Sequence, residues 1–283
     1  MKEVLTMWRH TQMVVLVALS AAIYAAVLIP LKGIPLVPGF IEIRPANAFP
    51  VVFGLLFGPA GAWGSAIGNL IGDFFGTLSP GSIGGFVGNF FFALLPYKMW
   101  GAYFRRGENI ETNVNSGKKF GVYVAVVLLA SVVCAVIISW FVDLLGLVPF
   151  AAALILIVPN NAIMGLVLGS ILLLALYPRV KRWGLLWTEI MNPEEVSASR
   201  FQKVGNVLVW VGGIGAAAVG LFLGLSAEQP QGLGIGLALL PFLLLVVVGS
   251  FMLGGREQVE AAQEMITAED EESEVEIRSE GER

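Results

Sequence analysis

Charged residues, cysteine and histidine are all scarce in this chain of 283 residues. Charged side chains make up 13% of the sequence, about half of their usual share in soluble domains. The single cysteine, Cys134, lies in an apolar run and has no second cysteine with which to form an intramolecular disulfide. The single histidine is His10. The sequence therefore predicts no metal site built from histidine, cysteine and carboxylate side chains.

Further absences exclude whole classes of function. With one histidine, no Ser-His-Asp or Cys-His catalytic site can be assembled within the apolar segments. We therefore expect no enzyme and no cofactor. The phosphate loop G-x-x-x-x-G-K-[ST] is absent, which argues against ATP hydrolysis by that route. Basic residues occur in ones and twos between apolar stretches, so we expect no nucleic-acid partner.

Apolar residues and glycine are abundant instead. Apolar side chains make up 57% of the chain, and 34 residues are glycine. Soluble domains contain about 45–50% apolar residues and about 7% glycine. Glycine allows helix backbones to approach closely within a bilayer. The composition therefore predicts an all-α integral membrane protein with closely packed helices, and it excludes a soluble enzyme.

The long apolar stretches predict eight membrane spans, with boundaries uncertain by several residues. They are residues 13–29, 46–58, 61–76, 83–101, 120–142, 148–177, 204–225 and 232–253. The second and third are short for a bilayer core of about 30 Å at about 1.5 Å per residue. They would otherwise form one span broken at Gly58-Pro59-Ala60-Gly61.

The positions of the basic residues decide between these two topologies, because cytoplasmic loops carry an excess of lysine and arginine. With eight spans and both termini in the cytoplasm, Lys32 and Arg44 are the two basic residues on the outer side, out of 17. Merging the second and third spans would move the group from Lys98 to Lys119 to the outer face. We therefore predict eight spans in the cell (cytoplasmic) membrane.

This topology divides the chain into four parts. Residues 1–183 form a six-helix substrate-binding membrane domain, 184–203 a cytoplasmic linker, and 204–254 a two-helix membrane extension. The tail, 255–283, is acidic and poor in aromatic residues, and 11 of the 21 acidic residues lie between Glu257 and the end. Such a composition predicts a solvated cytoplasmic segment that is disordered beyond a short helical stub.

Polar side chains within the spans are costly in lipid, so each is a candidate functional residue. Asn69 and Asp73 are four residues apart and share one helix face. In the eight-span topology, the polar residues converge on the outer half of the membrane. The predicted substrate-binding residues are Glu42, Arg44, Asn47, Asn69, Asp73, Asn89, Asn160 and Asn161. Their alternative roles are also open: interhelical hydrogen bonds for the amides, headgroup contact for Asp73, and a loop ion pair for Glu42 and Arg44.

Small residues recur every four positions along two of the predicted helices. One stripe consists of Ala18, Ala22 and Ala26, and the other of Gly64, Gly68, Gly72 and Gly76. Such stripes allow close helix contact. For the glycine stripe we expect packing within this chain. For the alanine stripe, a partner protein and internal packing are both open.

Taken in order, several of these segments resemble the substrate-binding S components of energy-coupling factor (ECF) transporters. They are the alanine stripe, Ile-Arg-Pro-Ala-Asn-Ala-Phe-Pro after the first span, the Phe-Gly-Pro-Ala-Gly turn, Gly-Asn-Leu-Ile-Gly-Asp, and Val-Pro-Asn-Asn-Ala-Ile-Met-Gly at 158–165. The resemblance covers residues 10–180, the length of a six-helix S component. Spans seven and eight and the tail lie outside that pattern.

The resemblance implies a small membrane protein that captures a vitamin or related micronutrient from outside. A transmembrane coupling protein and two cytoplasmic ATPases would then drive release of the small-molecule substrate into the cell. The family's coupling motif corresponds to Ala18, Ala22 and Ala26, its gating loop to residues 31–47, and its binding position in the last helix to Asn161. Relatives commonly carry a lysine near Met164, so the substrate of those relatives does not transfer to this chain.

A second class of function remains open beside the transport subunit. In that class, the chain is a membrane scaffold or assembly protein, its polar residues join helices, and its acidic tail recruits partners. A membrane-embedded enzyme is the weakest alternative, because one carboxylate and several amides without histidine make a poor catalytic set.

Overall fold

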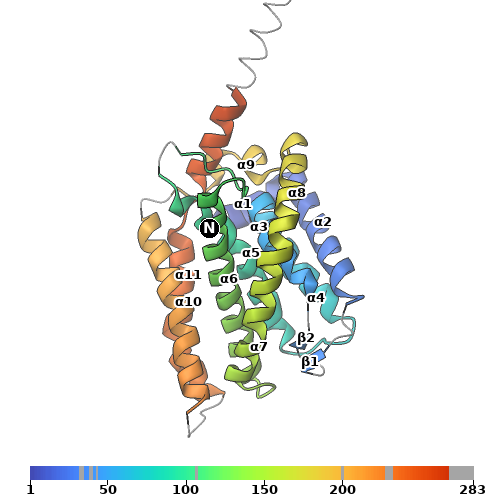
Figure 1. The fold of residues 1–283 in the computed structure, drawn as a ribbon, viewed down its shortest axis with the longest axis vertical. Helices are drawn as coiled ribbons and strands as arrows, with labels where there is room; N and C mark the ends of the chain where they lie inside the picture. Colours follow the sequence, from blue (N-terminus) through green and yellow to red (C-terminus); the bar gives the residue numbers. More distant parts are fainter. Residues whose placement is uncertain are drawn as a thin grey trace, which may run out of the picture.

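The computed structural model describes residues 1–31, 35–37, 41–42, 44–105, 108–198, 201–226 and 232–267. These residues form a helical bundle with one small hairpin (Figure 1). The helices are α1 (Glu3–Thr6), α2 (Thr11–Leu28), α3 (Ala48–Phe57), α4 (Pro59–Asp73), α5 (Ser82–Trp100), α6 (Gly117–Leu144), α7 (Phe150–Ile163), α8 (Gly169–Arg182), α9 (Trp187–Ile190), α10 (Gln202–Gly224) and α11 (Leu233–Met252). Short 3-10 turns cover Met7–Arg9, Pro45–Asn47, Gly101–Tyr103 and Pro193–Glu195. A π-helical turn, Met164–Leu168, joins α7 to α8.

The two ends of the bundle carry different elements (Figure 1). The N-terminal end carries α1, α9 and a further helix over residues 256–267, which we call the C-terminal helix. The opposite, hairpin end carries β1 (Pro35–Val37) and β2 (Ile41–Glu42), which pair antiparallel. The apolar pattern of the sequence did not predict this hairpin. The predicted class, an all-α integral membrane protein, is confirmed.

Each of the eight predicted spans corresponds to a helical segment of the structure. Among the described residues, five stretches are long and apolar enough to cross a membrane: Thr11–Leu28, Gly117–Leu144, Phe150–Ile190, Gln202–Gly224 and Leu233–Thr267. The helices α3 and α4 are shorter, with 10 and 15 residues. Nine of the ten residues of α3 are buried, so this helix runs through the interior of the bundle rather than along lipid.

Glycines of α4 form the contact with α2. A Cβ atom at Gly64 would lie 2.4 Å from the Ser20 Cβ, and one at Gly68 would lie 2.8 Å from the Ala21 carbonyl oxygen. These distances leave no room for a side chain, so this part of the glycine stripe packs within the chain as expected. The prediction for Gly76 was wrong, because this residue lies beyond the end of α4 and has a φ of +119° with open space around it.

The helix that follows the α6–α7 connection is irregular in its middle. Pro159 lies inside α7, where its missing N–H interrupts the ladder of backbone hydrogen bonds. The π-helical turn follows a few residues later, and the Tyr123 hydroxyl donates to the Gly165 carbonyl oxygen within it at 2.5 Å. Proline and a π-turn are ordinary causes of a bend in a helix, and here they flank Asn160 and Asn161.

The two-helix extension is fixed to the rest of the bundle at both ends. The helices α10 and α11 pack on each other and on α6 (Figure 1). At the hairpin end, the buried Asp143 carboxylate accepts from the Phe150 N–H at 3.0 Å and from the Gly232 N–H at 2.8 Å. At the N-terminal end, the Lys98 ammonium donates to the Leu253 carbonyl oxygen at 2.9 Å.

The linker between α8 and α10 packs against the N-terminal end of the bundle. Trp187, in α9, is fully buried and meets the Tyr97 ring edge-on, with the ring centres 4.7 Å apart. Gly58 provides the space, because a Cβ there would lie 2.7 Å from the Trp187 Cγ and its φ of +54° favours glycine. Part of the predicted linker is therefore a packed element of the fold.

Candidate functional site

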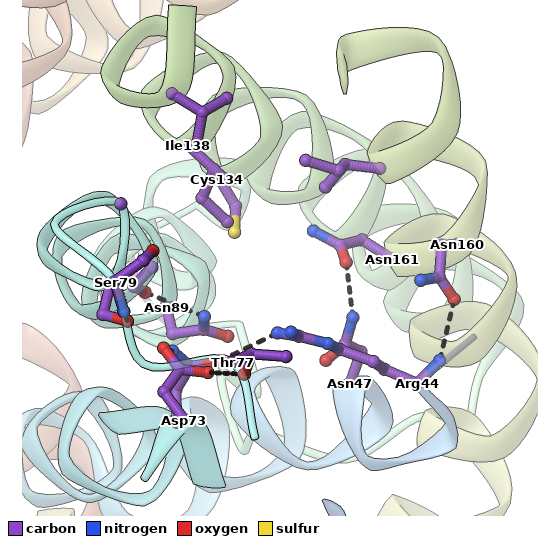
Figure 2. Close-up of a pocket in the computed structure, with 16 residues that line it drawn as sticks. Arg44, Asn47, Asp73, Thr77, Ser79, Asn89, Cys134, Ile138, Asn160 and Asn161 are labelled. Atoms are coloured by element: carbon purple, nitrogen blue, oxygen red, sulfur yellow. Dashed lines mark hydrogen bonds between the residues drawn. The ribbon is translucent and has the colours of Figure 1, made fainter. Parts of the chain in front are cut away.

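A polar cavity lies in the hairpin half of the bundle, between the α2–α3 connection and helices α4, α5, α6 and α7 (Figure 2). About 80 Å³ of it is open to the centres of water molecules, enough for roughly five to eight waters. The lining residues are Arg44, Asn47, Asn69, Asp73, Thr77, Ser79, Gly81, Ser82, Gly85, Asn89, Cys134, Ile138, Val142, Ile157, Asn160 and Asn161.

Two asparagines join the start of α3 to the middle of α7. The Asn47 Nδ2 donates to the Asn161 Oδ1 at 2.6 Å. The side chain of Asn161 is only 2% exposed, and its Nδ2 has no hydrogen-bond partner within the part of the chain that the structure describes. Buried amides almost always have partners. An unpaired donor on the wall of a cavity is therefore a position where a ligand acceptor would bind.

Tyr24 of α2 holds two of the lining amides from behind. Its hydroxyl lies 2.9 Å from the Asn47 Oδ1 and 3.1 Å from the Asn89 Oδ1, and it is fully buried. The Asn89 Nδ2 in turn donates to the Gly85 carbonyl oxygen at 2.9 Å, one turn earlier in α5. These contacts fix both amides in position before any ligand arrives.

The carboxylate of Asp73 lies at the end of α4, among groups that can donate to it. The Asn69 Nδ2 lies 3.3 Å from one oxygen, and the Thr77 hydroxyl donates to the other at 3.1 Å. Asn69 and Asp73 are one helical turn apart, which is why they meet on one face. Gly85 of α5 makes room for them, since a Cβ there would lie 2.8 Å from the Asn69 Nδ2.

Arg44 closes the cavity on the side of the hairpin. Its guanidinium donates to the Asn69 Oδ1 at 3.2 Å, and its backbone N–H donates to the Asn160 Oδ1 at 3.2 Å (Figure 2). One short segment before α3 thereby contacts both α4 and α7. Arg44 and Asp73 supply one positive and one negative formal charge, so the described lining residues have no net charge.

The opposite wall is apolar and comes from α6. Cys134, Ile138 and Val142 are spaced four residues apart and face the cavity. The Cys134 side chain is buried and has no disulfide partner. The cavity thus has amides, a carboxylate and a guanidinium on one side and an apolar surface on the other, as is usual for small-molecule sites.

The structure brings together seven of the eight predicted substrate-binding residues: Arg44, Asn47, Asn69, Asp73, Asn89, Asn160 and Asn161. The side chain of Glu42 lies outside the described residues, although its backbone belongs to β2. Met164, where relatives commonly carry lysine, is not among the lining residues. Within the described part of the chain, no cluster of three side chains is suited to hold a metal ion.

The sequence did not predict the apolar wall or Tyr24, which holds two lining amides from behind. It also did not predict three further polar lining residues, Thr77, Ser79 and Ser82. These last three had a visible signal, because they cluster where the predicted third and fourth spans meet at the outer side. The apolar wall on α6 had no such signal in the sequence. In a helix that is apolar all round, the sequence does not show which residues face a cavity and which face lipid.

The alanine stripe lies on a different surface from the cavity. Ala18, Ala22 and Ala26 are all exposed, whereas Ala21 and Ala25 face the interior. The stripe is therefore free of the packing that the glycines of α4 make with the other face of α2.

A membrane-embedded helical bundle that holds a polar cavity among its helices belongs to the class of small-molecule-binding membrane proteins. A comparison with protein families places the chain more narrowly. The family model described as QueT transporter matches residues 14–178, more than half of the chain. The chain belongs to this family of S components of ECF transporters. It is a substrate-binding transporter subunit and not an enzyme. Searches of curated proteins and of solved structures found no match.

Proposed function

We propose that this chain captures a queuosine precursor from outside the cell and passes it to a coupling protein and two ATPases of an ECF module. QueT transporters are S components for a queuosine precursor. Queuosine precursors share a 7-deazaguanine ring, which presents two adjacent N–H donors beside a carbonyl oxygen. The observation that carries the proposal is the chemistry of the cavity wall.

The cavity offers complementary groups for such an edge. The Asp73 carboxylate accepts hydrogen bonds on two oxygens, as the paired N–H donors of a guanine-type edge require. The unpaired Nδ2 of Asn161 is a donor for a carbonyl oxygen or ring nitrogen. The apolar wall of Cys134 and Ile138 supports the flat face of a heterocycle. A cavity with hydrogen-bonding groups on one side and an apolar wall on the other favours a neutral base over a charged vitamin.

The size of the cavity fits the same class of substrate. The cavity has space for several water molecules. A small two-ring heterocycle that displaces these waters is a compatible occupant. The cavity is thus suited to a free base rather than to a nucleotide.

The charges at the ends of the bundle support the orientation. Lys98, Lys118 and Lys181 all make ion pairs at the N-terminal end. Cytoplasmic segments are rich in lysine and arginine, which supports a topology with the N-terminal end inside and the cavity towards the outside. An importer in the cell membrane captures its substrate on that outer side.

The exposed alanines of α2 are the proposed contact with the coupling protein. A surface of small side chains lets another membrane helix approach closely. Ala18, Ala22 and Ala26 are exposed on the surface of the described bundle. We therefore infer that a helix of the partner protein packs against them.

Calorimetric titration of the purified protein tests the substrate. We expect 7-deazaguanine to bind and 7-deazaadenine, which lacks the paired donors, to bind at least about tenfold more weakly. In Asp73→Asn, one acceptor oxygen becomes a donor, and this preference should collapse. Equal binding of both bases by the unaltered protein would contradict the proposed substrate, and absence of any small-molecule binding would favour a scaffold.

A further inference from the structure

A second groove lies at the N-terminal end, formed in part by residues beyond the 14–178 that the family model covers. It runs between the connection that follows α5 and the C-terminal helix, and its volume is about 610 Å³. Its lining also includes Gln202, at the start of α10, and Gly254, just after α11. The groove is therefore built partly from residues outside the family match, and it shares no lining residue with the substrate cavity.

One wall of the groove is acidic. Glu257, Glu260 and Glu264 lie at positions i, i+3 and i+7 of the C-terminal helix, and all three are exposed. That spacing places them on one helix face along about 10 Å. The facing wall contributes Arg105 and Glu108. Glu108 is paired with Lys118, so the attraction for cations comes from the three exposed carboxylates of the C-terminal helix.

An unpaired amide lies at the base of this wall. Gln258 is only 3% exposed, and neither its Oε1 nor its Nε2 has a hydrogen-bond partner among the described residues. It lines the groove beside Gly101, where a Cβ would lie 2.6 Å from the Gln258 Nε2. A buried amide with a free donor and a free acceptor side by side is the complement of a peptide group, which offers one of each.

We propose that this groove binds a basic segment of a partner protein. Lysine or arginine side chains of that segment pair with Glu257, Glu260 and Glu264, and a main-chain peptide group pairs with Gln258. A divalent metal ion fits less well, because the described residues contain no cluster of three metal-binding side chains. A polyamine satisfies the carboxylates but has no peptide group for Gln258.

The test uses the full-length protein in nanodiscs of neutral phosphatidylcholine and fluorescein-labelled octalysine as the probe. The groove variant is Glu257→Gln/Glu260→Gln/Glu264→Gln, which removes three charges from exposed side chains. The matched control, Glu269→Gln/Glu271→Gln/Glu272→Gln, removes three charges from the tail. A further variant, Gln258→Met, keeps the side-chain length and removes the amide, and spermine serves as a cation without peptide groups.

We expect the groove variant to weaken octalysine binding by about tenfold or more at low salt. The tail variant should change it by less than about twofold. Gln258→Met should weaken octalysine by severalfold and leave spermine binding unchanged, with melting temperatures close to that of the unaltered protein. Equal losses in the groove and tail variants would overturn the proposal, as would a Gln258→Met variant that binds octalysine as tightly as before.

Discussion

The side-chain amide of Asn47 donates to the Asn161 Oδ1 at 2.6 Å, across 114 positions of sequence. This bond fixes the start of α3 against the middle of α7 at the cavity wall. It also orients Asn161 so that its Nδ2 is left unpaired at the cavity. The bond thus links the turn before α3 to the residue that we expect to contact the substrate.

Removing the amide of Asn161 should weaken substrate binding. In Asn161→Ala, a ligand acceptor loses its donor and Asn47 loses its partner, so we expect about a tenfold loss of affinity or more for 7-deazaguanine. The control is Asn115→Ala, which removes an exposed amide at the N-terminal end. Calorimetry measures both. Equal affinities in the two variants would remove Asn161 from the site.

A large side chain on the alanine stripe should prevent assembly with the coupling protein without affecting the folding of the isolated subunit. Ala22 is exposed, so Ala22→Trp should leave the melting temperature and substrate affinity of the isolated subunit nearly unchanged. The same change should abolish co-purification with the coupling protein and ATPases, because a tryptophan holds a partner helix away. A lower melting temperature with partners still bound would identify the stripe as an internal packing surface.

A methyl group added to α4 where it packs on the interior face of α2 should destabilise the isolated protein, unlike the change at Ala22. In Gly68→Ala, the new Cβ would lie 2.8 Å from the Ala21 carbonyl oxygen, so we expect a loss of about 1–3 kcal/mol in the free energy of unfolding. Gly121→Ala is the matched control, because its Cβ would meet nothing within 4 Å. Gly121→Ala should be neutral or slightly stabilising, since alanine favours the helix. Equal melting temperatures would show that α2 and α4 are further apart than described.

The buried ion pair between Glu3 and Lys98 should make stability depend on pH. Burial raises the pKa of Glu3, but the Lys98 and N-terminal ammonium groups outweigh it and lower the pKa from 4.5 to about 2. The folded protein therefore binds this proton less readily than the unfolded chain. The contribution to stability is complete above about pH 4.5 and is lost as the pH falls towards 2.

Two variants isolate this contribution. Lys98→Met should cost up to about 3–5 kcal/mol at neutral pH, because among the described residues it leaves the buried Glu3 carboxylate with the more exposed Met1 ammonium as its ion-pair partner. Glu3→Gln/Lys98→Met should recover much of that loss, since the poorly compensated buried carboxylate is gone and the charge left over is the partly exposed Met1 ammonium. Thermal unfolding of the double variant should also depend less on pH between about 5 and 3. A double variant as unstable as Lys98→Met, or one with an unchanged pH dependence, would contradict this account.

Helix positions and most of the cavity wall could be predicted from the sequence, because both follow from local patterns. Long apolar runs determine where helices occur, and Asn69 and Asp73 share a face through their spacing alone. Asn160 and Asn161 were visible because they follow Pro159 in an apolar run, where amides are costly. Their convergence followed from the direction of each span.

Features that depend on packing between distant segments could not be predicted. The role of Tyr24 requires knowing that α2 lies behind both Asn47 and Asn89. Trp187 reads as an ordinary linker residue until Gly58 is seen to make room for its ring. Gly76 extends a perfect four-residue repeat, yet α4 ends at Asp73 before reaching it. Periodicity in a sequence does not show where a helix stops.

Native mass spectrometry of the gently purified protein tests the central claim most directly, because a high-affinity capture subunit retains its substrate. We predict one bound molecule per chain with the mass and ultraviolet spectrum of a 7-deazaguanine, and a marked loss of that species in Asp73→Asn. A bound molecule of another chemical class, or a protein that stays empty when 7-deazaguanine is supplied, would contradict the account.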